Sequence, residues 1–245
     1  MEADMKIQKI RKLLLVISLM LFPVTLYYFS PVLIINAAFK GVMNGSFIVF
    51  CLMLVLSVPF GRLFCGYICP AGGLQECLYP VNSKSVRHFD IIRHIIWAVW
   101  LTAVIVCYAV NGGIHMIDPF FQTEHGISVS EIGAYIIYYG IVCLIVIPAL
   151  IHGKRAFCRY VCWMSPFMET GIRLRRLLKL DGLHIGADKG CISCGRCDKV
   201  CPMGIDVKNA AVTGYIDSTN CILCGACADN CPKHILRYEM RYKHD

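Results

Sequence analysis

The amino-acid sequence predicts an all-α membrane domain of four transmembrane helices, arranged as two repeated hairpins, followed by a small cysteine-rich α+β domain. Three observations lead to this fold class. Of the 245 residues, 57% are hydrophobic and 16% are charged, and the mean hydropathy is +0.61, whereas soluble domains carry about 25% charged residues. Four apolar stretches reach or approach the roughly 20 residues that cross a bilayer. Eight of the sixteen cysteines follow residue 190.

The four apolar stretches are the expected transmembrane helices. They run over residues 13–35, 46–60, 91–110 and 132–151, and the second is the shortest. The domain boundary is expected near residue 180, because a polar segment follows the fourth stretch. We therefore predict a membrane domain over residues 1–180 and a second domain over residues 181–245.

Lys and Arg residues orient the predicted helices. They are grouped at 6–12, 62–93 and 154–179, whereas the loop between the first two stretches has only Lys40 and the loop between the last two has none. Positively charged loops stay on the cytoplasmic side of a membrane. We expect a multi-pass protein of a prokaryotic plasma (inner) membrane with both termini cytoplasmic. The net charge of +8 then reflects topology and anionic lipid headgroups, so no nucleic-acid partner is predicted.

Two cysteine motifs dominate the tail. "CISCGRCDKVCP" begins at Cys191 and "CILCGACADNCP" begins at Cys221; they share seven of twelve residues at an offset of thirty. Each motif reads C-x2-C-x2-C-x3-C-P, the run of bacterial ferredoxins, in which the fourth cysteine binds the cluster of the other motif. The motifs predict a two-cluster ferredoxin domain holding two [4Fe–4S] clusters. The first ligand set is Cys191, Cys194, Cys197 and Cys231, and the second is Cys221, Cys224, Cys227 and Cys201.

Disulfides and zinc are the alternatives for these eight cysteines. A cytoplasmic domain keeps its thiols reduced, and three closely spaced cysteines followed by Cys-Pro match a zinc ribbon poorly. Both alternatives are disfavoured. A domain of this size has too little core to fold well unaided, so bound clusters would also stabilise it.

The membrane part contains an internal repeat. "RLFCGYICPAGGLQE" from Arg62 and "RAFCRYVCWMSPFME" from Arg155 share six of fifteen residues, including two cysteines spaced C-x3-C. Both motifs emerge on the same face, so the two halves are expected to be related by an axis along the membrane normal. If each C-x3-C segment begins a helix, its thiols lie on one face at i and i+4. The candidate ligands of a third iron–sulfur centre are Cys65, Cys69, Cys158 and Cys162.

Other interpretations of these four cysteines remain open. They could be free thiols or redox-active C-x3-C pairs. Cys51, Cys107 and Cys143, within the apolar stretches, are expected to be free and buried, and Cys77 is left out of the site. Haem is unsupported, because no stretch has a histidine in its interior. The neighbouring Arg62 and Arg155 are expected to offset the charge of the thiolates.

The chain resembles the membrane-bound polyferredoxins. These include the quinol-dehydrogenase-type subunit of periplasmic nitrate reductase systems, the C-terminal half of the nitrous-oxide reductase regulator, and a cytochrome oxidase accessory protein. Cys65–Pro70, Cys158–Cys162 and Cys191–Pro232 carry the resemblance, which extends over nearly the whole chain. Trp163 departs from the family pattern, because the second motif should have proline there, so we expect a different turn after Cys162.

The resemblance implies electron transfer between a cytoplasmic donor or the quinone pool and a membrane or extracytoplasmic partner, often one that bears flavin or haem. We therefore expect an electron-transfer subunit of an oxidoreductase complex rather than a stand-alone enzyme. Two alternatives remain. One is an assembly or maturation factor that supplies electrons to a metalloenzyme, and the other is a subunit of a redox-driven ion pump.

Overall fold

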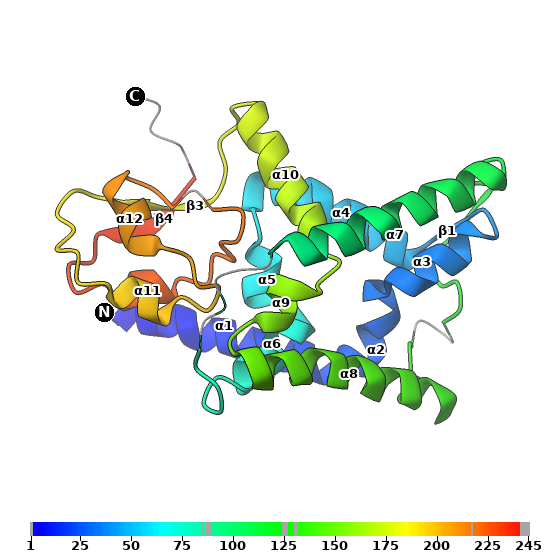
Figure 1. Ribbon diagram of the computed structural model, residues 1–245, viewed down its shortest axis with the longest axis horizontal. Coiled ribbons are helices and arrows are strands. Elements are labelled where there is room, and N and C mark those ends of the chain that lie inside the picture. Colours follow the sequence, from blue (N-terminus) through cyan, green and yellow to red (C-terminus); the bar gives the residue numbers. More distant parts are fainter. Residues whose placement is uncertain are drawn as a thin grey trace.

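The computed structural model divides into a long helical part and a small part with a β-sheet at one end (Figure 1). It describes residues 2–84, 86, 90–123, 127–129, 132–216 and 218–240. The side chain of Lys6 and the whole of Arg87, two of the cations used above for orientation, lie outside the described residues, as do residues 241–245.

The first apolar stretch is not one straight helix. Helix α1 (Glu2–Met20) is followed by α2 (Phe22–Thr25), the 3-10 helix η1 (Leu26–Phe29) and α3 (Pro31–Ala38). The axis bends by 61° between the segments 7–20 and 22–29. Pro23 and Pro31 lack the N–H that would continue the helix, and the side chain of Ser30 accepts the backbone N–H of Leu33 at 3.4 Å to start α3. The stretch predicted as one span over 13–35 is therefore broken into several helices.

Two described helices are long and apolar enough to cross a bilayer. They are α7 (Asp90–Val110) and α8 (Ile132–His152), and the bent pair around Leu21 makes a third if it counts as one span. Helix α4 (Gly45–Phe60) has 16 residues, which corresponds to about 24 Å at 1.5 Å per residue. That length falls short of a typical hydrocarbon core of about 30 Å. Two of the four predicted spans therefore correspond to single helices long enough to cross a bilayer.

The second helix of each motif packs against a long helix of the other half of the repeat. The first motif forms α5 (Leu63–Tyr67) and α6 (Pro70–Cys77), and the second forms α9 (Ala156–Tyr160) and α10 (Ser165–Leu177). Helix α10 packs along α4, whereas α6 packs on α8 and on α1. Each motif helix thus contacts the long helix of the other half, which brings the motifs together.

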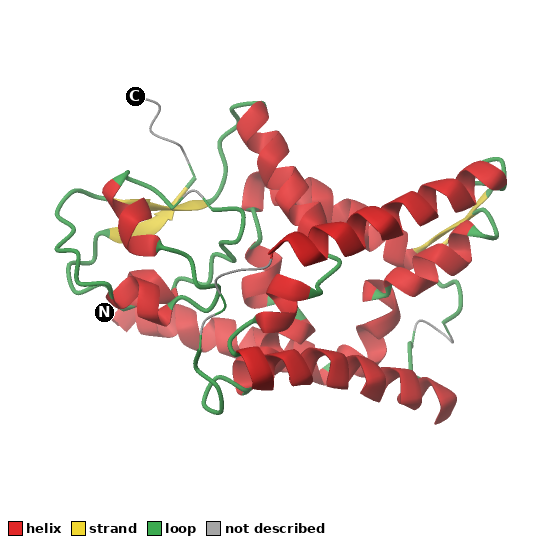
Figure 2. Cartoon of the chain, viewed as in Figure 1, coloured by secondary structure: helices red, strands yellow, loops and turns green. Residues whose placement is uncertain are grey.

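At the other end of the molecule, two short strands join the loops that the charge pattern assigns to the outer side (Figure 2). Strand β1 (Val42–Asn44) pairs in parallel with β2 (Met116–Asp118), with Val42 opposite Met116. The strands connect the segment before α4 with the segment after α7.

The small part is built around an antiparallel pair of strands. Strand β3 (His184–Ala187) pairs with β4 (Leu236–Glu239), with His184 opposite Glu239. Three short helices, α11 (Arg196–Val200), α12 (Val207–Val212) and α13 (Ala226–Asp229), complete it. Its core contains the buried side chains Ile185, Met203, Val207, Ile216 and Ile222.

Candidate functional site: three cysteine-lined cavities

The four cysteines of the repeated motif line one apolar cavity. Cys65, Cys69, Cys158 and Cys162 are all buried, with 3–7% of each residue exposed. Together with side chains of η1, α8 and the two motifs, they form its wall. The internal repeat predicts that these four cysteines lie close together, and the structure places them around one cavity.

The two cysteines of each motif do not lie on one face of a single helix. Cys65 lies in α5, but α5 ends at Tyr67, and Cys69 is extended (φ −65°, ψ 118°) before Pro70. A residue before proline disfavours the helical region. The backbone N–H of Cys69 donates to Phe64 at 3.0 Å, and that of Cys162 donates to Phe157 at 3.0 Å. The expectation of one continuous helix carrying i and i+4 thiols is wrong, although both thiols reach the same cavity.

Trp163 stands where the first motif has proline, and the turn after Cys162 differs from the turn after Cys69. Helix α10 begins at Ser165, with Pro166 in its first turn, whereas α6 begins directly after Cys69. The indole N–H of Trp163 donates to the carbonyl of Phe29 at 2.9 Å, and its ring packs edge-on against Phe157. Trp163 thus closes the cavity wall toward η1.

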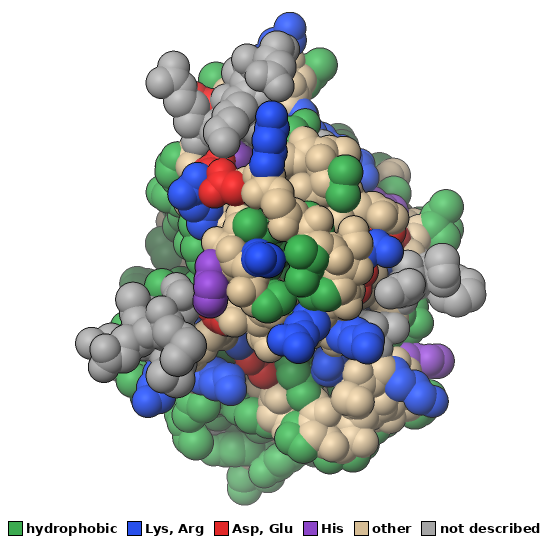
Figure 3. Space-filling view, turned by 90° about the vertical axis from the view of Figure 1, so that its left-hand side faces the viewer, with side chains coloured by type: hydrophobic (Ala, Val, Ile, Leu, Met, Phe, Trp, Pro, Cys, Tyr) green, Lys and Arg blue, Asp and Glu red, His purple; other side chains and the backbone are tan. Residues whose placement is uncertain are grey.

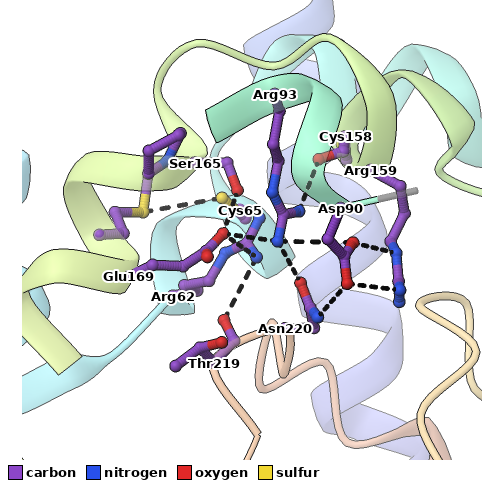
Figure 4. A network of polar contacts seen from close by, with 12 residues as sticks. Arg62, Cys65, Asp90, Arg93, Cys158, Arg159, Ser165, Glu169, Thr219 and Asn220 are labelled. Atoms are coloured by element: carbon purple, nitrogen blue, oxygen red, sulfur yellow. Dashed lines mark hydrogen bonds and ion pairs between the residues drawn. The ribbon is translucent and has the colours of Figure 1, made fainter. Parts of the chain in front are cut away.

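Arginine and glutamate side chains cross between the two repeats. Arg62 of the first motif pairs with Glu169 of the second at 3.4 Å, and Arg155 of the second pairs with Glu76 of the first at 3.2 Å. Arg93 also binds Glu169 at 2.8 Å (Figure 4), and Arg11 pairs with Glu76. The internal repeat singled out Arg62 and Arg155 as conserved between the two motifs. It did not predict that the glutamate of each motif pairs with the arginine of the other motif.

This buried network carries excess positive charge beside the thiols. Five buried arginines (Arg11, Arg62, Arg93, Arg155 and Arg159) meet three carboxylates (Glu76, Asp90 and Glu169), so two positive charges are unbalanced. Within the described residues, Nε and Nη2 of Arg62 have no hydrogen-bond partner, although Arg62 is fully buried. Unbalanced buried charge is costly. An anionic centre bound by thiolates would balance it, so the residues present fit an iron–sulfur cluster.

Burial disfavours the thiolate form of Cys65, Cys69 and Cys162 by raising the pKa of each. Burial raises the pKa of Cys162 to about 12 and that of Cys69 well above its usual value. Metal binding requires the thiolate form and deprotonates a coordinating thiol. The apolar wall and the arginines thus fit a site in which the cysteines become thiolates when they bind a metal centre.

One thiol of this cavity has an amide donor, whereas its counterpart in the other repeat, Cys65, lies beside the guanidinium of Arg62. Gln75 is fully buried and accepts the backbone N–H of Phe157 at its Oε1 at 3.1 Å. That contact fixes the orientation of the amide, because only oxygen can accept. The Nε2 group therefore points at Cys158 Sγ, at 3.2 Å. Met168 occupies the equivalent position in the other repeat, and its thioether lies 3.7 Å from Cys65 Sγ.

The eight tail cysteines divide between two further cavities. Cys191, Cys194, Cys197 and Cys231 line one, and Cys201, Cys221, Cys224 and Cys227 line the other. Each cavity thus takes three cysteines from one motif and the fourth from the other. Burial raises the pKa of Cys221 to about 12 and that of Cys227 well above its usual value.

Each of the three cavities is lined by four cysteines. In the part of the chain that the structure describes, no three His, Cys, Asp or Glu side chains are close enough to share a single metal ion. Four soft thiols around a cavity provide the donor set of an iron–sulfur cluster. Of the cysteines expected to be free and buried, Cys107 is buried, whereas Cys51 and Cys143 are exposed on their helices.

The cavity formed mainly by the second ferredoxin motif lies against the membrane motif. The carbonyl of Ile222 approaches Gly66 so closely that a Cβ there would collide with it, and Gly66 directly follows Cys65. Gln8 of α1 donates to the carbonyl of Cys224 at 2.8 Å. Arg93 donates to Asn220 at 2.7 Å. The loop carrying Cys221 and Cys224 is therefore docked on the helix carrying Cys65.

Comparison with known families agrees with this division. A family model described as a "4Fe-4S binding domain" matches residues 45–88 and 136–181, the two repeats. A "4Fe-4S dicluster domain" matches residues 190–236. The chain therefore contains two kinds of [4Fe–4S]-binding domain, and the prediction of two [4Fe–4S] clusters is confirmed. It is mostly helical with a ferredoxin-type domain.

Three curated proteins are similar to the chain over 63% of its length. Two are uncharacterized proteins of Methanocaldococcus jannaschii: MJ0749, 26% identical, with 56% of its length covered, and MJ0750, 25% identical, with 64% covered. The third, from Escherichia coli strain K12, is named "Putative electron transport protein YccM"; it is 23% identical with 45% of its length covered. The matched region thus spans about half to two-thirds of these relatives. No solved structure matches.

Proposed function

We propose that this chain is an integral-membrane iron–sulfur electron-transfer subunit with three centres in series. The order runs from the Cys191/Cys194/Cys197/Cys231 set, through the Cys201/Cys221/Cys224/Cys227 set, to a third centre held by Cys65, Cys69, Cys158 and Cys162. The observation that carries the proposal is the contact of Ile222 with Gly66, which joins the second and third cavities through adjacent backbone. The similarity to an electron transport protein supports the same role.

Iron–sulfur clusters exchange single electrons when bound. The chain supplies ligation, spacing and exclusion of water. Arg62 and Arg155 stabilise negative charge at the membrane motif, Gln75 donates a hydrogen bond to one ligand sulfur, and the apolar wall keeps solvent from the third cavity. The proposed partners are a donor on the cytoplasmic side and a quinone or a flavin- or haem-bearing subunit in or beyond the bilayer.

Iron content and EPR spectroscopy of the full-length protein test this assignment. Anaerobically purified protein should contain about 12 iron atoms per chain if all three sets are occupied by cubanes, against about 8 if only the tail is. The reduced protein should show magnetic coupling between neighbouring centres. The Cys65→Ser/Cys158→Ser variant should lose about four iron atoms and that part of the coupling. A wild-type protein that contains about 8 iron atoms and is spectrally unchanged in this variant would contradict the third centre.

A further inference from the structure

The two tail cavities differ in their access to solvent. At the first, Cys194 is exposed and Cys191, Cys197 and Cys231 are partly exposed. At the second, Cys221 is partly exposed, but Cys201, Cys224 and Cys227 are buried, with 7–8% of each residue exposed. The second cavity is covered by the helical part, so the first is the edge that an external protein can reach.

Cations surround the exposed cavity. Arg196, Lys208 and Lys233 line it, with no carboxylate in its wall, and Lys189 and Lys199, each two residues from a ligand cysteine, are exposed. Among the described residues, none of these five side chains forms an ion pair within 4.0 Å.

Nearby carboxylates are fewer than these five cations, although Asp198 keeps its charge beside Cys197. Asp188 pairs with Arg237 at 2.8 Å, and Asp198 accepts the backbone N–H of Lys208 at 2.9 Å. On the face of the molecule that includes this end, Lys and Arg side chains recur, whereas Asp and Glu side chains show at few places (Figure 3). The surface thus presents a positive field around the cavity.

The same surface has an apolar centre. Ile192, between two ligand cysteines, is 56% exposed and lines the cavity mouth. An apolar centre within a charged rim is the usual anatomy of a protein–protein interface. The small part lies beyond one end of α7 and α8 (Figure 1), so this surface extends away from the apolar helices, which disfavours a lipid surface as its occupant.

We infer that the rim of the Cys191/Cys194/Cys197/Cys231 cavity is the docking surface for an acidic, soluble one-electron carrier protein. The inference rests on the proposed function, because it assigns the partner of the first centre in the series. In the direction tested below, the reduced carrier loses one electron and the centre held by these four cysteines gains it; no bond or proton is exchanged. Complementary charge accelerates such an encounter and orients it.

Reduction of the full-length protein in detergent tests the inference. The probes are a reduced, acidic [2Fe–2S] ferredoxin and the cationic radical of methyl viologen, and rapid-freeze EPR follows the [4Fe–4S] signals. At low ionic strength, the Lys189→Glu/Lys233→Glu variant should slow reduction by the ferredoxin at least about tenfold. Reduction by methyl viologen should be as fast as in the wild type or faster. The difference between variant and wild type should shrink at high salt, where surface charges are screened.

A charge-matched control separates docking from net charge. Lys84→Glu/Lys179→Glu changes the net charge equally at two exposed residues on other loops and should leave the ferredoxin rate near that of the wild type. Equal slowing in both variants, or a wild-type rate independent of salt, would overturn the docking surface. If Lys189→Glu/Lys233→Glu loses iron, the glutamine versions of the same substitutions replace it. A wild-type protein without tail clusters would instead refute the proposed function, so the two failures are distinguishable.

Discussion

Gln75 shows at the scale of one residue how the structure makes two equivalent thiols inequivalent. The repeat places Gln75 and Met168 at matching positions, but only the amide can donate to sulfur. Hydrogen bonds to cluster ligands raise the reduction potential, because they stabilise the more negative, reduced form. Cys158 therefore differs from Cys65 in its environment, although the two cysteines occupy the same place in the repeat.

Replacing Gln75 with leucine should lower the potential of the third centre. The loss of one N–H donor to a charged sulfur is expected to shift the midpoint negatively by on the order of 50 mV, which is about 1 kcal/mol for one electron. EPR-monitored redox titration measures the shift. Met168→Leu is the matched control at the equivalent position, where no donor is lost. A larger shift in the control than in Gln75→Leu would contradict the role of Gln75.

Buried arginines are the residues that sequence reasoning interpreted least well. Arg11, Arg62, Arg93 and Arg155 were counted as loop cations that orient the helices, yet all four are buried and ion-paired. A cation near the end of an apolar stretch satisfies the orientation rule and a buried network equally well. Only the repeat, which aligns Arg62 with Arg155, indicated a further role.

At the scale of elements, the exchanged ion pairs should lock the two motifs together. Glu76→Ala leaves the fully buried Arg155 without its carboxylate, so the free energy of unfolding should fall by roughly 3–5 kcal/mol. Denaturant unfolding of the detergent-solubilised protein measures this loss. Glu76→Gln keeps the shape and should cost less. Equal stability of Glu76→Ala and wild type would show that the pair does not join the halves.

The contact between α5 and the ferredoxin loop gives a second element-scale prediction. Gly66→Val should displace the loop, because its side chain would meet the carbonyl of Ile222. The tail should keep its iron, but the magnetic coupling between the second and third centres should weaken. Gly140→Val, on α8 with nothing within 4 Å of an added Cβ, is the control. Unchanged coupling in Gly66→Val would contradict the series arrangement.

The elements also show which parts of the fold the sequence predicts. The tail motifs predict their crossed grouping, because the fourth cysteine of each run is expected to bind the cluster of the other motif. The internal repeat predicts the meeting of Cys65 with Cys158. The break in the first apolar stretch was missed, because Pro23 and Pro31 leave its average hydropathy high while removing backbone donors. Prolines are tolerated often enough in transmembrane helices that composition alone did not locate the bend.

The orientation in the membrane is the prediction at the scale of the whole molecule. The ferredoxin part lies at one end and the β1–β2 pair at the other (Figure 1), with α7 and α8 between them. The β2 loop lacks Lys and Arg over residues 111–131, which favours its export. An alkaline phosphatase fusion after Phe120 should therefore be active, and one at the C-terminus inactive, whereas a fluorescent-protein fusion at the C-terminus should fluoresce. The reverse pattern would place the ferredoxin part outside, where a reducing cytoplasmic carrier could not reach the exposed cavity.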